Sequence, residues 1–111
     1  MARETVFDMK VSRVYPLLVK KAERKGRTRQ EVDQIISWLT GYDMSHIDQD
    51  MSYGDFFRNA PDYNPRADLI TGSICGIKIE EIEDPLMQRI RRLDKLIDEL
   101  AKGKPMEKIL R

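Results

Sequence analysis

The stretch D-P-L-M-Q-R-I-R-R-L-D-K-L-I-D-E-L-A-K-G, residues 84–103, decides the fold because it carries the clearest helical pattern in the chain. Asp84 is suited to cap a first turn, Pro85 fits the position after the cap, and Gly103 is suited to end the helix. The stretch therefore predicts a long amphipathic helix, and Pro105 begins a short one after it. The apolar residues alternate at spacings of four and three, which places them on one helix face: Leu86, Ile90, Leu93, Ile97 and Leu100.

The same spacing also occurs in the seam of a coiled coil, so two interpretations are open. Packing inside the monomer is favoured, because the stripe covers barely two heptads. In that case the basic residues of this stretch form a solvated face that can meet an acidic segment of another subunit. These residues are Arg89, Arg91, Arg92 and Lys95.

Residues 28–41 predict a second helix with clear ends. Thr28 and Glu31 have the spacing of a capping box, in which each side chain accepts a hydrogen bond from a free backbone N–H group. Gly41 is suited to end this helix. The apolar residues between the two ends follow helical spacing: Val32, Ile35, Ile36 and Leu39.

Residues 12–26 predict a further helix. Ser12 is a suitable N-cap, Pro16 falls in the first turn where its missing N–H group costs little, and Gly26 is suited to a left-handed cap. The first ten residues show no clear period. The apolar stripe of this helix consists of Val14, Leu17, Leu18 and Ala22.

The middle of the chain carries shorter signals. A short helix is predicted within residues 43–51, and another after a capping box formed by Ser52 and Asp55. Asn64 and Pro65 begin a further helical turn that ends near Gly72. The first of these helices has an apolar face of Met44, Ile47 and Met51, with Asp43 or Ser45 as its cap.

Residues 73–79 alternate β-branched and small residues, which predicts a short extended segment with a bend at Gly76. Cys75 lies in this segment and is the only cysteine, so neither an intramolecular disulfide nor a cysteine-based zinc site can form. A lone cysteine in apolar company is usually a small buried hydrophobe.

These elements together predict an all-α fold, an orthogonal bundle of about five or six helices, with at most a minor extended segment near residues 73–79. The length of 111 residues is that of one domain, so residues 1–111 are expected to form a single helical domain. The predicted core consists of Leu17, Leu18, Val32, Ile35, Ile36, Leu39, Phe56, Phe57, Ile90, Leu93, Ile97 and Leu100.

Charge is distributed unevenly along the chain, although the formal net charge is only +1. Residues 1–29 carry nine basic and three acidic residues, whereas residues 30–84 carry three basic and twelve acidic ones. Residues 85–111 are basic again, with eight basic and four acidic residues. Such asymmetry points to a charged partner, or to segments that neutralise one another within the fold or a dimer.

The most basic segment, which lies within residues 1–29, is a candidate for nucleic-acid binding. Its first helix, the turn at Gly26 and the second helix have the spacing of a helix-turn-helix, and its cations suit phosphates. Glu31 and Asp33 at the front of the second helix would face phosphates unfavourably. The isoelectric point near 7.8 is also low for a nucleic-acid binder. The candidate residues are Lys20, Lys21, Arg24, Lys25, Arg27 and Arg29.

His46 is the only histidine, so any Ser-His-Asp or Cys-His arrangement must use it. Ser45 lies beside it in sequence, but adjacent residues of a helix point in different directions. In a helix, Asp43, His46 and Asp50 would share one face and suit a divalent ion. Solvated polar faces have the same pattern, so we predict no catalytic residue, no metal site and no cofactor, and the sequence favours a protein that is not an enzyme.

Three segments resemble a family of small bacterial proteins, the domain of unknown function 2200. They are V-Y-P-L-L-V-K-K-A-E-R-K-G-R-T (residues 14–28), E-V-D-Q-I-I-S-W-L-T-G-Y (residues 31–42) and residues 84–111. The blocks W-L-T-G-Y and L-I-D-E-L-A-K-G-K carry the resemblance. It implies a bacterial cytoplasmic protein with an α-helical, orthogonal-bundle fold, and it implies no activity, cofactor or functional residue.

The sequence thus favours a non-enzymatic protein that interacts with another protein or forms a homodimer. Nucleic-acid binding through residues 20–29 is the alternative, and a metal or enzyme site near His46 is less favoured. The N-terminus leads into no apolar signal segment, and no apolar run approaches the ~20 residues that span a bilayer. We therefore expect a soluble cytoplasmic protein with no membrane partner.

Overall fold

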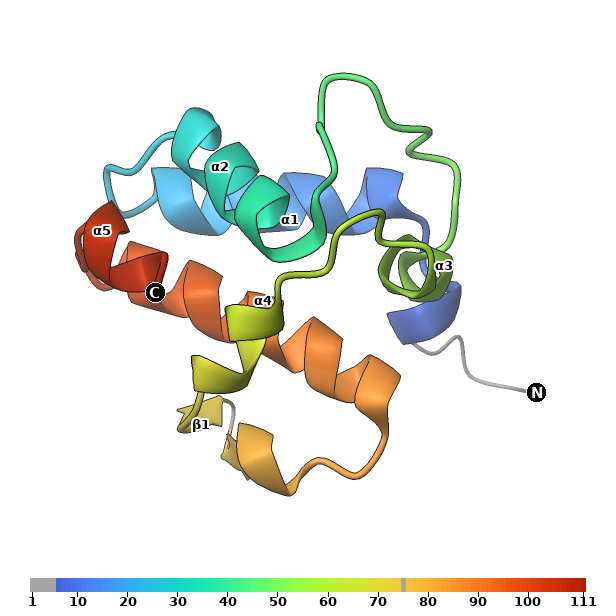
Figure 1. Ribbon diagram of the computed structural model, residues 1–111. Helices are drawn as coiled ribbons and strands as arrows, with labels where there is room; N and C mark the ends of the chain where they lie inside the picture. Colours follow the sequence, from blue (N-terminus) through green and yellow to red (C-terminus); the bar gives the residue numbers. More distant parts are fainter. Residues whose placement is uncertain (1–5, 75) are drawn as a thin grey trace.

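The helix α4, Pro85–Ala101, lies at the centre of the structure, a computed structural model that describes residues 6–74 and 76–111 (Figure 1). It contacts the four other α-helices of the described chain. Figure 1 shows α1 and α4 running across the view while α3 is seen end-on, so α3 crosses these two helices steeply. These four helices are α1 (Val11–Glu23), α2 (Arg29–Thr40), α3 (Tyr53–Arg58) and α5 (Met106–Ile109).

Both ends of α4 form as the sequence predicts. The Asp84 carboxylate accepts a hydrogen bond from the N–H group of Leu86 at 2.9 Å, which caps the first turn. At the other end, the N–H group of Lys104 donates to the Glu99 carbonyl at 3.1 Å and that of Gly103 to the Leu100 carbonyl at 3.1 Å. This pair is a Schellman motif, and Gly103 adopts the left-handed conformation that it needs, with φ of 92°.

The predicted capping box of α2 is confirmed. The Glu31 N–H group donates to the Thr28 hydroxyl at 3.1 Å, and the Thr28 N–H group donates to the Glu31 carboxylate at 3.0 Å. The end of α1 is also a Schellman motif, because the N–H group of Arg27 donates to the Ala22 carbonyl at 3.0 Å around a left-handed Gly26. A tight turn at Gly26 therefore joins α1 to α2.

The prediction that Ser12 caps α1 is wrong. The helix begins one residue earlier, at Val11, and no side chain caps it. Instead, the N–H groups of Val11 and Ser12 donate to the backbone carbonyls of Met51 and Gln49 at 3.0 and 2.9 Å. A distant segment of the chain thus satisfies the free donors of the first turn, so no capping side chain is required.

The prediction that Leu17 belongs to the core is also wrong, because Leu17 is 57% exposed. The buried side of α1 is centred on Val11, Val14 and Tyr15. Leu17 lies two residues after Tyr15, which corresponds to about 200° around a helix, so the two side chains cannot both point inward. Leu18 is half-buried and packs against the core.

Residues 43–51 do not form the predicted helix. They form a series of turns, in which the Asp43 carboxylate accepts the N–H group of Ser45 and the Asp48 carboxylate accepts that of Asp50. Side chains that bond to the backbone two residues ahead compete with helix formation. Met44 is nevertheless buried, so the segment is fixed to the core without being helical.

The other short elements follow their local signals. Ser52 caps α3 through the N–H group of Asp55, and Asn64 caps a 3-10 helix, Pro65–Leu69, through that of Arg66. The extended segment pairs with itself, as strands β1 (Ser73–Ile74) and β2 (Ile77–Lys78) form a small antiparallel hairpin with Gly76 at φ of 78°. Two further 3-10 helices span Val6–Asp8 and Ile79–Glu81. The prediction about Cys75 lies outside the described residues.

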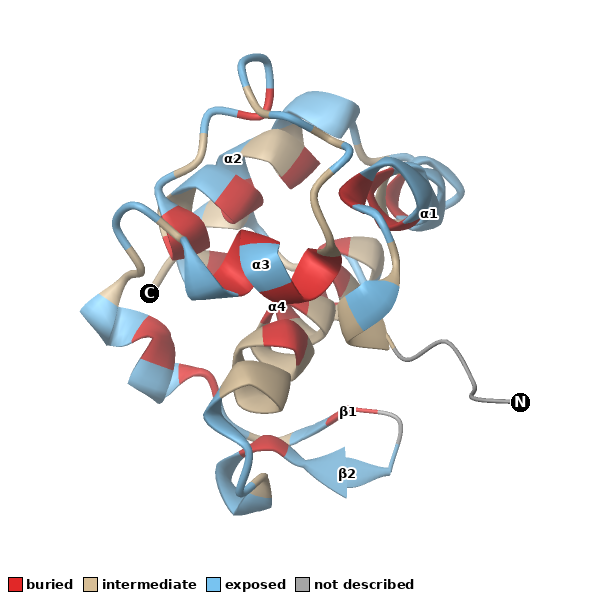
Figure 2. Ribbon diagram, turned by 90° about the vertical axis from the view of Figure 1, so that its right-hand side faces the viewer, coloured by how far each residue is buried: buried red, intermediate tan, exposed pale blue. Residues whose placement is uncertain are grey.

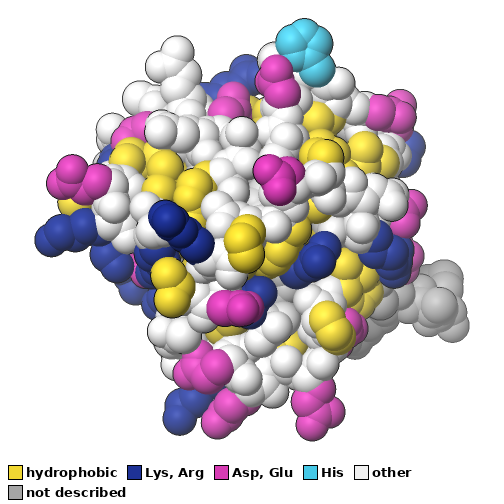
Figure 3. All heavy atoms as spheres, viewed as in Figure 1, with side chains coloured by type: hydrophobic (Ala, Val, Ile, Leu, Met, Phe, Trp, Pro, Cys, Tyr) yellow, Lys and Arg dark blue, Asp and Glu magenta, His cyan; other side chains and the backbone are white. Residues whose placement is uncertain are grey.

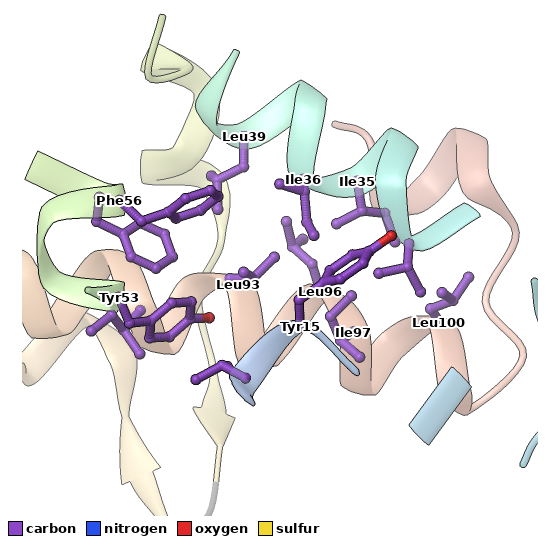
Figure 4. Close-up of a cluster of buried hydrophobic side chains, with 14 of the residues drawn as sticks. Tyr15, Ile35, Ile36, Leu39, Tyr53, Phe56, Leu93, Leu96, Ile97 and Leu100 are labelled. Carbon is purple, nitrogen blue, oxygen red and sulfur yellow. The ribbon is translucent and has the colours of Figure 1, made fainter. Parts of the chain in front are cut away.

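One cluster of buried side chains joins all five α-helices (Figures 2 and 4). In Figure 4 the side chains of Leu93, Leu96 and Ile97 on α4 lie beneath those of Ile35 and Ile36 on α2. The aromatic rings of α3 fill the other end, with the ring centroids of Phe56 and Phe57 5.3 Å apart. The remaining predicted core residues are buried as expected: Val32, Leu39, Ile90 and Leu100.

Candidate functional site

The outward side of α1 is the candidate functional surface. Figure 2 shows the buried residues of α1 facing the rest of the molecule and its exposed residues facing away from it. Pro16 and Leu17 form an exposed apolar centre on this side. Lys20 and Arg24 follow one and two turns later and are exposed as well. We call Pro16, Leu17, Lys20 and Arg24 the α1 face.

The six basic residues predicted to bind nucleic acid fall into two groups. Lys20, Arg24 and Lys25 are exposed, and no side-chain partner is found for them among the described residues. Lys21 is exposed as well, but its ammonium group lies 3.6 Å from the Asp98 carboxylate of α4. Arg27 and Arg29, the other two, are held by contacts within the fold.

Arg27 ties the turn between α1 and α2 to the end of α4. Its guanidinium group donates to the carbonyls of Leu100 and Lys104 at 3.2 and 3.0 Å, and to the Glu31 carboxylate at 2.7 Å. The ion pair raises the pKa of Arg27, and the Arg27 guanidinium in turn lowers the pKa of Glu31. Only 17% of the Arg27 side chain is exposed. It therefore donates to carbonyls at the end of α4, where few helix N–H groups remain to meet them, and it does not project from the α1 face.

Arg29 covers the edge of a buried tyrosine. Its Nε donates to the Tyr15 hydroxyl at 3.0 Å, and its guanidinium lies 5.7 Å from the centre of the Tyr15 ring. The Tyr15 hydroxyl also donates to the Asp33 carboxylate on α2. Burial and, next, the hydrogen bond to Asp33 raise the pKa of Tyr15, so this phenol stays protonated at neutral pH.

An open groove of about 360 Å³ runs beside the α1 face. One wall is α1 and the other is formed by Arg29 and Gln49. The charges that line it have mixed sign, because Lys20 and Arg29 stand with Glu23. A groove with this mixture has no clear preference for an anion. Its full lining is Tyr15, Pro16, Val19, Lys20, Glu23, Arg29 and Gln49.

The first turn of α1 lies beside an acidic segment. The Ser12 N–H group is bonded to the Gln49 carbonyl, which holds Asp48 and Asp50 on either side of this contact near the start of the helix. Both carboxylates are exposed, and neither has a cationic partner among the described residues. Arg13 is exposed at the same end and makes contacts of its own. The surface near the start of α1 is thus of mixed sign, because Lys10 and Arg13 are exposed beside these carboxylates, whereas the end of the helix is mainly basic.

His46 stands on the surface in a local turn. Figure 3 shows it protruding from the molecule, and its side chain is 81% exposed. The Ser45 hydroxyl and the Asp43 carboxylate both contact the same ring atom, Nδ1, at 3.0 and 2.9 Å. A catalytic triad needs the serine and the aspartate on opposite ring nitrogens, so these three side chains do not have triad geometry.

The turn nevertheless has a clear electrostatic effect. Hydrogen bonds from Ser45 and then from His46 lower the pKa of Asp43 from 3.8 to about 2. The predicted helical face of Asp43, His46 and Asp50 is not formed, because residues 43–50 are not helical. Within residues 6–74 and 76–111, no group of three or more potential metal ligands occurs.

The basic residues of α4 do not form the predicted solvated face. Arg89 donates to the Phe57 carbonyl at 2.7 Å, and its guanidinium lies 4.0 Å from the centre of the Tyr63 ring. Arg92 forms an ion pair with Asp68 at 3.1 Å, and Lys95 donates to the Ser73 carbonyl at 3.1 Å. Arg91 pairs with Asp94 at 3.1 Å on the same helix. Three of these four cations therefore bind residues in the acidic middle of their own chain, because that segment folds over the helix.

A further structural ion-pair group lies near the C-terminus and was not predicted from the sequence. Glu99 is 9% exposed, and its carboxylate binds Arg111 at 2.8 Å and Lys104 at 3.2 Å. The position of Glu99 beside the apolar stripe of α4 is the only signal that could have indicated its burial. None of the described helices is both long enough and apolar enough to cross a membrane.

Comparisons with known proteins agree with this fold. A model of the family described as "Uncharacterized protein conserved in bacteria (DUF2200)" matches residues 5–111, which confirms the resemblance seen in the three sequence segments. The crystal structure of the uncharacterized protein SP1917 is similar, with 53% sequence identity, a TM-score of 0.90, and coverage of 98% of this chain and 93% of that chain. No curated protein matches the chain.

Proposed function

We propose that this chain, which belongs to the DUF2200 family of bacterial proteins, is a non-enzymatic module that binds another protein through the α1 face. The observation that carries the proposal is the exposed Leu17 on a helix whose neighbouring cations, Lys20 and Arg24, have no partner among the described residues. An apolar centre with a charged rim is the usual composition of a protein-binding surface.

The other exposed large hydrophobic residues of the described chain support this choice of surface less well. Leu69 is 58% exposed, but the neighbouring Asp68 is already paired with Arg92. Ile77 is 45% exposed on β2, a strand of only two residues. Leu17 alone of the three lies on a long helix beside unpaired charges, where a partner gains both apolar contact and ion pairs.

Nucleic-acid binding by the same helix pair remains the second candidate. Lys20, Lys21, Arg24 and Lys25 favour it, because phosphates attract exposed cations. Three features weigh against it. Arg27 is engaged within the fold, Glu23 and Asp33 stand among the cations, and Asp48 and Asp50 lie at the other end of α1. A surface of mixed sign fits a protein better than a polyanion.

The test of the proposal is a pull-down from a bacterial lysate with chemical cross-linking. It uses the wild-type chain, the pair Lys20→Glu with Arg24→Glu, and a control pair, Lys78→Glu with Lys108→Glu, at exposed lysines outside α1. We expect the wild-type chain and the control to capture the same protein, and the α1 variant to lose it. Equal capture by all three chains, or none by any, would overturn the proposal.

The second candidate is tested by fluorescence anisotropy with labelled duplex DNA and single-stranded RNA at low and high salt. The proposal expects no binding that depends on Lys20 and Arg24. Binding that weakens steeply with salt and disappears in the α1 variant, but not in the control, would replace protein binding by nucleic-acid binding as the function.

A further inference from the structure

We infer that the partner of the α1 face is an acidic helix that lies along α1 and carries carboxylates on both sides of one apolar side chain. The inference rests on the proposed function, because it names the kind of protein segment that the same surface would bind. Its basis is the spacing of the exposed cations along α1.

The exposed cations of α1 form a series along one side of the helix. Lys10 comes directly before the first turn, Lys20 lies within the helix and Arg24 follows its last residue. Arg13 and Leu17 complete the series, in which spacings of three and four residues alternate. All five side chains are exposed. Residues at these spacings share one side of a helix, so we call Lys10, Arg13, Leu17, Lys20 and Arg24 the α1 ridge.

Leu17 is the apolar member of the α1 ridge and lies at its centre. It is seven residues from Lys10 and seven from Arg24. At about 1.5 Å per residue, the two cations are ~10 Å before and after it along the helix. The Leu17 side chain is 57% exposed. The ridge therefore presents one apolar contact between two basic ends.

The cations at both ends of the ridge are available to a partner. Lys10, Lys20 and Arg24 have no ion-pair partner among the described residues. Arg13 makes contacts of its own, so the inference does not depend on it. Glu23 lines the groove beside α1 and is not a member of the series. Carboxylates of a partner can therefore form ion pairs at either end.

The spacing favours a helix as the carrier of these carboxylates. Alternating spacings of three and four occur where two helices pack side by side, as at the a and d positions of a coiled coil. On α1 the pattern recurs on the outward side, with cations in most of its positions. A helix with glutamates and one apolar residue at these spacings would match the ridge in charge and in its apolar centre. The buried side of α4 has the same spacings, at Ile90, Leu93, Ile97 and Leu100.

The position of Leu17 favours such a helix over a nucleic acid. Phosphates would pair with Lys10, Lys20 and Arg24, but they would leave Leu17 without an apolar contact. A helix supplies both the charges and the apolar side chain, which is the usual composition of a protein interface.

The size of the ridge sets the affinity that is expected. One side of a helix of 13 residues presents less than the roughly 800 Å² per partner of a standard interface. Exposed ion pairs are also screened by salt. The complex should therefore be weak, and high salt should weaken it further.

The experiment measures the binding of labelled, alanine-rich helical peptides of about 20 residues by fluorescence anisotropy at low salt. The stripe peptide has a central leucine and two glutamates on each side of it, at alternating spacings of three and four residues. The dispersed peptide has the same composition, but its glutamates are spread around the helix. The exchanged peptide is the stripe peptide with lysines in place of the two glutamates at one end. Circular dichroism verifies that all three are helical.

The peptides are compared on three proteins. These are the wild-type chain, the variant Lys20→Glu with Arg24→Glu, and the control Lys78→Glu with Lys108→Glu, which changes the net charge by the same amount. We expect the wild-type chain and the control to bind the stripe peptide at least about tenfold more tightly than the dispersed peptide. The α1 variant should lose this binding and prefer the exchanged peptide. A reversed preference cannot arise from a general loss of folding.

Two results would overturn the inference and leave the proposed function intact, provided that a lysate protein is still captured through Lys20 and Arg24. One is equal binding of the stripe and dispersed peptides by the wild-type chain, which would indicate attraction by bulk charge. The other is no binding of the stripe peptide up to the solubility limit of the protein. Binding of duplex DNA that depends on Lys20 and Arg24 would instead overturn the proposed function, and the inference with it. The two failures are therefore distinguishable.

Discussion

The helices α4 and α1 both carry rows of basic residues, but the fold uses the two rows differently. Every residue of α4 from Leu86 to Ala101 is buried or half-buried, and each of its arginines is bound to a group of the same chain. On α1, the outward side remains exposed, and Lys20 and Arg24 have no partner among the described residues. A row of basic residues is structural when its cations have partners within the chain, and it is available to bind another molecule when they do not. The number of cations does not decide between the two.

The difference follows from position in the bundle. The central helix contacts α1, α2, α3 and β1, so its long side chains reach carbonyls and carboxylates of the segments around it. The peripheral helix is covered on one side only. Long cationic side chains on its other side extend into solvent, where only a second molecule can meet them.

The largest difference in stability between the two helices is expected when one leucine in each is replaced. Leu93→Ala removes a side chain that is 0% exposed on α4 and should lower the free energy of unfolding by about 3 kcal/mol. Leu17→Ala on α1 should change it by less than ~0.5 kcal/mol, because the side chain is mostly in solvent. Urea denaturation of dilute protein measures both. Equal losses would show that α1 is packed as closely as α4.

Two arginines provide the next comparison. Arg27→Ala removes one hydrogen-bond donor each from the carbonyls of Leu100 and Lys104 and from the carboxylate of Glu31, and should cost about 2 kcal/mol. Arg24→Ala, three residues earlier, removes no such bond and should cost less than ~0.5 kcal/mol. Thermal denaturation at low protein concentration measures the two changes. A similar effect of both would mean that Arg24 is also a structural residue.

A smaller effect is expected on the pH dependence of stability. Arg27 lowers the pKa of Glu31 below its ordinary value of 4.5, so the folded chain binds fewer protons there than the unfolded chain. The contribution of Glu31 is therefore fully present above about pH 4.5 and is lost as the pH falls through the folded pKa. Glu31→Gln should flatten the decline in urea midpoint on acidification, whereas Glu107→Gln, at an exposed position, should not. An unchanged decline in the Glu31 variant would refute this linkage.

The smallest effect concerns the turn that contains Asp43, Ser45 and His46. Ser45→Ala should raise the pKa of Asp43 from about 2 towards 3.8, because the hydroxyl is the main donor to that carboxylate. His46→Ala should raise it less, since the imidazole is the second contributor. Titration of the Asp43 carboxyl signal by NMR measures both shifts. A pKa that neither substitution moves would contradict the turn geometry, while the fold should remain intact in both variants.

The parts of the fold that sequence analysis predicted correctly depend on local interactions. The ends of α4 follow from Asp84, Pro85 and Gly103, and the start of α2 follows from Thr28 and Glu31, within a few residues of the groups they satisfy. The apolar stripes of these two helices are broad and unambiguous, so their buried faces were predicted as well. The minor extended segment was also predicted, because its β-branched residues flank a glycine that permits the turn.

The parts that sequence analysis missed depend on distant segments. Carbonyls of residues 49 and 51 cap α1, and no pattern near Ser12 indicates them. Local turns replaced the expected helix in residues 43–51, because the carboxylates of Asp43 and Asp48 bond to the backbone. Arg27 resembled the other basic residues of its segment, but the end of α4 lies within its reach.

By itself the sequence determined the long helices, most of their ends and most of the core, because capping and hydrophobic periodicity act over one or two turns of chain. Only the tertiary structure decided which side of α1 faces solvent and which cations remain unpaired. Tyr15 and Leu17 compete for the inward side of the same helix, and the contacts of Tyr15 with Asp33 and Arg29 on α2 favour Tyr15. Which of the two side chains points inward depends on contacts with the neighbouring helix. The local sequence pattern of α1 carries no information about those contacts.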